Sequence, residues 1–373
     1  MEEALSMNKN MQRVPWKLLL ALTGFSSLCA VQAVAADFIY VASGNTVQGY
    51  SSTGVAGTLF TPTVGWANAF ALTTDSSGNL YVSDAGANRI VEFNSSGTQL
   101  AVLTIPPDLT GGGISPQEIA LSGGGDLYVT SFNGNILKFA NATGTGTIVE
   151  NIPGARGILI NSTTTYVTAS GLGSASGVYS FTTGGGGAIT PLADTTTAYP
   201  GGQLRGLARD SAGSLYVADS SWGGAGYIDI SSTGGTSWSN FGLNNTDQAA
   251  GGPNDIAIAN ASATPTSSAG QSLYIADYFT GIVEEYQDNT ATATGHRGNF
   301  VKNLVTISGH NITGIAFVGS AGNTASLSDQ PVFFSDLATV QQTPEPGTWA
   351  LLLGALIMAP ATRASRRRKS SIN

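Results

Sequence analysis

The sequence predicts an all-β protein, a β-propeller of six blades, and three observations lead to this prediction. An apolar segment centred on an aromatic residue recurs along the chain at spacings of 41, 47, 38, 50, 58 and 59 residues. The chain contains 49 glycines and only 10% charged residues, a composition that suits short strands and tight turns. No segment of the central region has a sustained helical periodicity of apolar residues.

The recurring segment has the pattern of a strand that is buried on both faces. Its Leu-Tyr-Val core is nearly continuous in apolar residues, as expected where a blade packs between two neighbouring blades. The copies are Phe38–Ser43, Leu80–Asp84, Leu127–Thr130, Thr165–Thr168, Leu215–Asp219 and Leu273–Asp277, with a weaker seventh copy at Pro331–Asp336.

Two companion elements accompany each strong copy. A second strand follows at Thr46–Tyr50, Arg89–Phe93, Asn135–Phe139, Val178–Phe181, Tyr227–Ile230 and Ile282–Tyr286. A third element is rich in small residues, which suits the crowded innermost strand of a blade. It occurs at Ala69–Leu72, Glu118–Leu121, Gly157–Ile160, Gly206–Ala208, Asp255–Ile258 and Gly314–Phe317.

The blade count follows from the six innermost strands. The N-terminal strands around Tyr40 and Tyr50 then complete the blade that begins at Gly314. This closure removes exposed sheet edges from a long β chain. The surplus strand at Val332–Phe334 leaves seven blades as the alternative.

The repeat resembles those of NHL-type six-bladed propellers. The resemblance is closest in Asp75–Ile90 and extends over nearly all of residues 37–342. Lactonases of similar architecture hold a central metal with Glu, Asn and Asp side chains. We assign no residue of this chain to such a site.

Residues 1–36 are predicted to be a secretory signal peptide that directs export through the Sec machinery. A basic flank precedes an apolar stretch at Leu18–Val31, which is short for a span of about 20 residues. Ala33, Ala35 and Ala36 provide the small residues of a cleavage site. An uncleaved membrane anchor is the alternative. Cys29 is the only cysteine, so its removal would leave the mature protein without thiol or disulfide chemistry.

Residues 343–373 have three features of a sorting signal. Pro344, Glu345 and Pro346 come first, and an apolar helix is predicted to open near Trp349. A basic end follows, which includes Arg366, Arg367 and Arg368. We expect the apolar segment to span the inner membrane temporarily with the arginines in the cytoplasm. A plain single-span anchor is the alternative.

These three features resemble the PEP-CTERM signal, over about the last thirty residues. The resemblance implies processing by an exosortase-type sorting transpeptidase in a Gram-negative bacterium. It also implies a final location at the cell surface or outside the cell, with a link to exopolysaccharide or biofilm.

Charge excludes one class of partner. Residues 36–343 contain 7 Lys and Arg against 20 Asp and Glu, a net charge of about −13. A surface of this sign disfavours nucleic acid, whose binding depends on cationic contacts to phosphate.

Five residues are candidates for a binding site. Asp84, Asp219 and Asp277 end equivalent strands, and three carboxylates at one end of a propeller could ligate Ca²⁺, a hard cation that prefers oxygen ligands. The alternative is that each aspartate caps its own turn. Trp222 and Tyr278 follow two of these aspartates and could form a carbohydrate platform, or could simply pack between blades.

The sequence favours a non-enzymatic surface or matrix protein whose propeller binds a glycan, an ion or another protein. No catalytic residue is assigned. The first alternative is a lactonase-like hydrolase or lyase, which requires convergent polar side chains from at least three blades at the central mouth. The second alternative is a structural spacer.

Overall fold

The computed structural model describes residues 38–106, 115–170, 176–194, 203–210, 213–220, 226–231, 235, 238–241, 252–259, 272–288, 298–309 and 311–317. The chain divides into two units, Met1–Pro331 and Val332–Asn373, and every described residue belongs to the first. The predicted signal peptide and sorting signal, and the surplus strand at Val332–Phe334, lie outside these ranges. No helix within them is long and apolar enough to cross a membrane.

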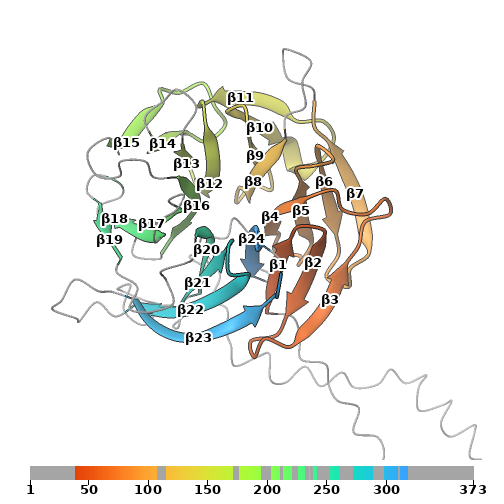
Figure 1. Cartoon of the computed structure of the whole chain (residues 1–373). Helices are drawn as coiled ribbons and strands as arrows, with labels where there is room; N and C mark the ends of the chain where they lie inside the picture. Colours follow the sequence, from red (N-terminus) through yellow and green to blue (C-terminus); the bar gives the residue numbers. More distant parts are fainter. Residues whose placement is uncertain are drawn as a thin grey trace, which may run out of the picture. The chain divides into compact units, whose positions relative to one another are not determined.

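Six four-stranded antiparallel sheets form the blades of a propeller (Figure 1). The innermost strands contact one another in sequence around the axis, and the last of them contacts the first. They are β4 (Ala69–Thr74), β8 (Pro116–Leu121), β12 (Ala155–Asn161), β16 (Leu204–Arg209), β20 (Pro253–Ala259) and β24 (Gly314–Phe317). The predicted innermost position of the small-residue elements is therefore confirmed.

The aromatic-centred copies form the second strand of each blade, as their buried pattern indicates. These strands are β1 (Ile39–Ser43), β5 (Leu80–Asp84), β9 (Leu127–Ser131), β13 (Thr164–Ala169), β17 (Leu215–Asp219) and β21 (Ser272–Asp277). The third strands are β2 (Thr46–Tyr50), β6 (Arg89–Phe93), β10 (Asn135–Phe139), β14 (Gly177–Thr182), β18 (Tyr227–Ser231) and β22 (Ile282–Asp288).

The outermost strands are the most exposed. They are β3 (Ala56–Phe60), β7 (Gln99–Thr104), β11 (Thr147–Asn151), β15 (Thr190–Asp194), β19 (Ser239–Asn240) and β23 (Gly298–Thr306). The only helical element in the described part of the chain is a 3-10 turn at Ala140–Ala142.

Blade I joins the two ends of the described chain. Its strand order is β24-β1-β2-β3, and β1 pairs with β24 so that Ile39 lies opposite Phe317. Blades II to VI each use four consecutive strands, beginning at β4, β8, β12, β16 and β20. The prediction of six blades, with the first completed by the N-terminal strands, is confirmed.

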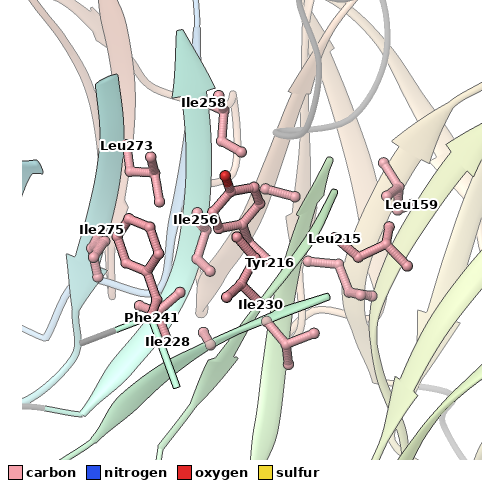
Figure 2. Close-up of a cluster of buried hydrophobic side chains, with 14 of the residues drawn as sticks. Leu159, Leu215, Tyr216, Ile228, Ile230, Phe241, Ile256, Ile258, Leu273 and Ile275 are labelled. Atoms are coloured by element: carbon pink, nitrogen blue, oxygen red, sulfur yellow. The ribbon is translucent and has the colours of Figure 1, made fainter. Parts of the chain in front are cut away.

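Apolar side chains from adjacent blades make up the core. In the cluster around blade V, Leu215 lies on the side of Leu159 of blade IV, whereas Tyr216 lies on the side of Ile256 of blade VI (Figure 2). Successive side chains of a strand point to opposite faces, so both faces of β17 are buried between blades. This packing explains why the second strands lack a simple alternation of apolar and polar residues.

The innermost strands of blades II to VI each begin with an irregularity that has consequences for the whole fold. In blades II to V, two residues of the innermost strand face one residue of the second strand, which is the pattern of a β-bulge. In blade IV, for example, Arg156 and Gly157 face Thr168. The bulge turns backbone groups of these residues out of the ladder of their own blade.

Hydroxyl groups opposite three of the bulges connect neighbouring blades. The Thr168 Oγ1 atom accepts a 2.7 Å hydrogen bond from the Gly157 N–H group and donates a 2.6 Å bond to the Arg205 carbonyl of blade V. Thr130 connects blades III and IV in the same way, and Ser83 connects blades II and III. One buried hydroxyl thus satisfies two backbone groups that the bulges leave unpaired.

We expect Thr168→Val to lower the free energy of unfolding by about 1–3 kcal/mol. The substitution leaves a buried N–H group and a buried carbonyl of two blades without partners. The measurement is urea unfolding followed by circular dichroism.

Thr73→Val is the matched control. Thr73 is equally buried in β4, but its hydroxyl has no hydrogen-bond partner among the described residues. Its replacement should leave stability unchanged or raise it. Equal losses in the two variants would contradict the connecting role of Thr168.

Candidate functional site

The bulges bring two layers of side chains to the central mouth. The upper layer consists of Phe70, Gln117, Arg156, Arg205 and Asn254, one from each of blades II to VI. The next residue of each strand belongs to the lower layer, which contains Ala71, Glu118, Gly157, Gly206 and Asp255, with Gly314 of blade I at the equivalent position. Bulges commonly re-aim side chains in this way near functional sites.

A small hollow, partly open to solvent and with an enclosed space of about 10 Å³, lies between these layers. It is lined by Phe70, Gln117, Glu118, Arg156, Gly157, Arg205, Gly206 and Asn254. Polar side chains of four blades therefore converge at the mouth, an arrangement that the hydrolase or lyase alternative requires and that also suits ligand binding.

Three glycines of the lower layer are required by close approach of the neighbouring strand. A Cβ atom at Gly157 would lie 2.2 Å from the Arg205 carbonyl oxygen, one at Gly206 would lie 2.8 Å from the Asp255 Cα atom, and one at Gly314 would lie 2.5 Å from the Phe70 carbonyl oxygen. Side chains at these positions would separate the innermost strands. The lower layer consequently presents only two long side chains, Glu118 and Asp255.

Glu118 and Asp255 come from opposite blades, III and VI, and interact electrostatically at the axis. Both are buried, at 4% and 0% exposure. Burial, followed by the charge of Asp255, raises the pKa of Glu118 well above its usual range. Burial also raises the pKa of Asp255, whereas hydrogen bonds from the Ile315 and Ile256 N–H groups oppose the rise.

The hydrogen bonds determine which carboxyl group holds the proton. Asp255 accepts its two backbone bonds at 2.9 and 2.8 Å, while Glu118 accepts one from the Ile119 N–H group at 3.4 Å. Hydrogen bonds to a carboxylate favour its charged form. Burial raises the pKa of Asp255 to about 7, and we infer that Asp255 is the more acidic of the two groups and that Glu118 holds the proton they share near pH 7.

Arg156 and Arg205 are adjacent in the upper layer and have no carboxylate partner among the described residues. Arg156 donates to Gln117 Oε1 at 3.2 Å, and Arg205 donates to Gln203 Oε1 at 3.1 Å. The Nε atom of each is buried without a partner in the described part of the chain. Burial, followed by the charge of Arg156, lowers the pKa of Arg205 to about 10.

Aromatic side chains border the arginines. The Arg156 guanidinium lies over the Phe132 ring at 4.7 Å from its centroid, and Phe132 is 47% exposed. Tyr278 is close enough to Arg205 to affect its pKa, and its ring meets that of Phe279 edge to face at 5.4 Å. Tyr278, which the sequence proposed for a carbohydrate platform, thus lies beside the mouth. Trp222 is outside the described residues.

The three predicted aspartates each bind backbone N–H groups close to their own strand ends. Asp84 accepts from Asn68 at 2.8 Å and also forms an ion pair with Arg89 at 2.9 Å. Asp219 accepts from Gln203, and Asp277 accepts from Gly252, Phe279 and Thr280. These are the contacts of the turn-capping alternative.

The structure does not bring these aspartates together as a Ca²⁺ site. Within the described ranges, no three or more His, Cys, Asp or Glu side chains gather so that they could hold a metal ion. Each carboxylate is already occupied by backbone or arginine donors of its own blade.

Sequence reasoning missed the mouth residues as a site, although it placed Glu118 and Asp255 in innermost strands. A signal was present. Each innermost strand has an Ile or Leu directly after its pair of mouth positions, and the six strands can be aligned on this residue. The position before it is a small residue in four strands and an acid in the other two. The position before that one varies between strands and is arginine in two of them.

The buried pair at Glu118 and Asp255 predicts a pH-dependent stability. Because Glu118 binds its proton more tightly in the folded protein than in the unfolded chain, stability falls as pH rises from about 4.5 toward the folded-state pKa. The slope for one proton is about 1.4 kcal/mol per pH unit. Glu118→Gln should flatten this slope in urea unfolding measured from pH 4.5 to 9.

Glu150→Gln, on the outermost strand β11, is the control and should keep the wild-type slope. If Glu118→Gln and wild type lose stability equally with rising pH, Glu118 does not carry the buried proton.

No family model and no curated protein matches the chain. Three solved structures are similar in fold. One is a chain of a nidogen/laminin complex, with 15% identity and a TM-score of 0.56, covering 75% of this chain and 98% of that chain. A second is a streptogramin B lyase, with 15% identity and a TM-score of 0.51, covering 77% of this chain and 89% of that chain. A third is a catalytically inactive virginiamycin B lyase from Staphylococcus aureus with quinupristin, with 16% identity and a TM-score of 0.51, covering 78% of this chain and 94% of that chain. These likenesses establish the propeller fold of the chain, while its resemblances to NHL repeats and to the PEP-CTERM signal stay predictions.

Proposed function

We propose that this chain is an exported, non-enzymatic protein of the cell surface or extracellular matrix, and that its propeller binds a ligand at the central mouth. The observation that carries the binding role is the convergence of polar side chains from four blades on one hollow. A purely structural spacer would have no need for arginines and carboxyl groups buried at its axis, since each costs free energy to desolvate.

The dimensions of the hollow restrict what enters it. Pockets that enclose a drug-sized molecule have volumes of about 300–1,000 Å³. The enclosed space of the hollow is only about 10 Å³, room for about one water molecule, and the hollow is partly open to solvent. We infer that a ligand lies across the open mouth rather than inside an enclosed pocket, and that it is a small molecule or the end group of a larger one, such as a glycan chain.

The location rests on the ends of the sequence. The predicted signal peptide at residues 1–36 supports export, and the tail at residues 343–373 supports transient retention in the inner membrane before exosortase processing. A link to exopolysaccharide or biofilm follows from the PEP-CTERM resemblance alone.

Replacing Pro344, Glu345 and Pro346 by alanine should leave the protein unprocessed and in the inner membrane. The measurement is fractionation of the native host followed by immunoblotting. Replacement of Val340, Gln341 and Gln342 by alanine, just upstream of the predicted signal, is the control and should be processed normally. Unchanged release of the first variant would contradict the sorting hypothesis.

Gln117→Met should weaken ligand binding at the mouth by about fivefold or more, because it removes the amide that contacts Arg156. The measurement is a thermal-shift screen of neutral, cationic and anionic small molecules, followed by calorimetry of the compounds that bind. Gln48→Met, in the third strand of blade I, is the matched control. The proposed site is wrong if the two variants bind every such compound equally.

A hydrolase or lyase is the second candidate function. The observation that favours it is the pair of buried carboxyl groups, because environments that separate two pKa values can assign an acid and a base role. Turnover separates the two candidates. A bound compound that is converted to product by wild type, but not by Glu118→Gln, would favour the enzyme, whereas unaltered compound favours the binding protein.

A further inference from the structure

The cations of the mouth differ from most others in the described chain. Arg89, Lys138 and Lys302 each have a carboxylate within 2.9, 2.6 and 3.4 Å, respectively. Arg209 has none, but its guanidinium lies away from the mouth and approaches Asn161 Oδ1 at 3.5 Å. Among the described cations, Arg156 and Arg205 combine proximity to a like charge with the lack of a carboxylate.

This arrangement is unfavourable in the empty protein. Each guanidinium is only partly exposed, and each reduces the stability of the other's positive charge. Gln117 and Gln203 supply single neutral acceptors, which do not offset the charge. An anion between the two arginines would remove the repulsion and fill the vacant donor positions, since guanidinium binds carboxylates through parallel N–H···O bonds.

The floor and rim of the mouth restrict the kind of anion. Glu118, on the floor, is neutral and can donate a hydrogen bond, while the Asp255 carboxylate is engaged by two backbone N–H groups. The exposed faces of Phe132 and Phe279 provide apolar contacts for an organic group. A fully hydrated inorganic anion would make no use of them.

The chain as a whole is acidic, with a net charge of −8. Attraction of an anion therefore depends on the local arginine pair rather than on the field of the protein. A local pair favours a small ligand of low charge over a polyanion, which would be repelled by the surrounding surface.

We propose that Arg156 and Arg205 bind the carboxylate of a small organic acid, or of the acidic end group of a larger molecule, with its apolar part against Phe132 and the Tyr278–Phe279 edge. This inference rests on the proposed function, whose ligand it specifies by chemical class.

The test is calorimetry with formate, succinate, benzoate and phenylacetate, each compared with its amide, and with inorganic phosphate. We expect at least one organic carboxylate to bind and its amide to bind about tenfold or more weakly. Arg156→Met and Arg205→Met should each reduce that affinity by about tenfold to a hundredfold, the loss expected for a charge-assisted hydrogen-bonded contact. Arg209→Met, a change at the other end of β16, should have no effect.

Thermal unfolding of the variants without ligand tests whether a loss of binding results from a loss of folding. Because each substitution at the mouth removes a partly buried charge that has no counter-ion, Arg156→Met and Arg205→Met should unfold at or above the wild-type temperature. A loss of both binding and stability would indicate a structural role for the arginines and would overturn the inference.

Three further outcomes would also overturn it. Binding of phosphate alone would assign the pair to an inorganic anion. Equal binding of acid and amide would show that charge is not recognised. Binding only of neutral or cationic compounds, in a manner that depends on Gln117, would reject the carboxylate while retaining the mouth as the site. The proposed function itself fails only if no compound of any charge depends on Gln117.

Discussion

The β-bulge at the start of the innermost strands of blades II to V determines both how neighbouring blades are joined and which side chains reach the central mouth. An unbroken ladder in blades II to V would direct backbone groups of these residues at the second strand of their own blade. The bulge instead releases one N–H group and one carbonyl, which the hydroxyls of Ser83, Thr130 and Thr168 connect to the next blade. The same two residues project toward the axis. Blade-to-blade cohesion and ligand geometry therefore depend on one local feature.

This coupling accounts for the uneven chemistry of the mouth. In blade VI, where Ala276 occupies the position of the hydroxyl, and in blade I, other groups join the blades. Asp255 accepts a hydrogen bond from Ile315 of blade I, and Thr313 donates to Ala69 of blade II. Asp255 is thus a connecting residue as well as a member of the carboxyl pair, so its substitution would disturb the ring and the site together. Among the described residues, the Glu118 side chain has no hydrogen bond to another blade, so Glu118 is the better probe of the pair.

The sequence predicted much of the fold because each blade repeats one burial pattern. Leu-Tyr-Val runs identified the second strands, small residues identified the innermost strands, and Gly314 with Tyr40 identified the shared blade. The mouth could not be predicted in the same way. Bulges shift the register, and a shift by one residue exchanges the faces on which side chains lie. Arg156 and Arg205 therefore did not stand out from their strands, and the convergence of four blades is a property of the closed ring.

The aspartates show the opposite case, in which a pattern visible in the sequence allowed both a metal site and turn capping, and the observed contacts are those of turn capping. Asp84, Asp219 and Asp277 recur at equivalent positions because every strand end needs an acceptor for the N–H groups of the loop beside it. Repetition around a ring places such residues at one end of the propeller without bringing them together. A residue that recurs in many blades indicates a structural role in every blade. A residue confined to one or two blades, such as Arg156 or Glu118, indicates a role in the site.

Blade I contains strands from both ends of the described chain, and this has a consequence for biosynthesis. The second strand of this blade is made first and its innermost strand last, so β1 keeps an open edge until Gly314–Phe317 has been synthesised. An unpaired strand edge is a template for association with other chains. The nascent chain must therefore remain protected over almost the entire length of the domain, and nearly complete fragments that end before residue 314 would be the species most prone to aggregate. The open edge of β1 is covered only when the last strand closes the ring.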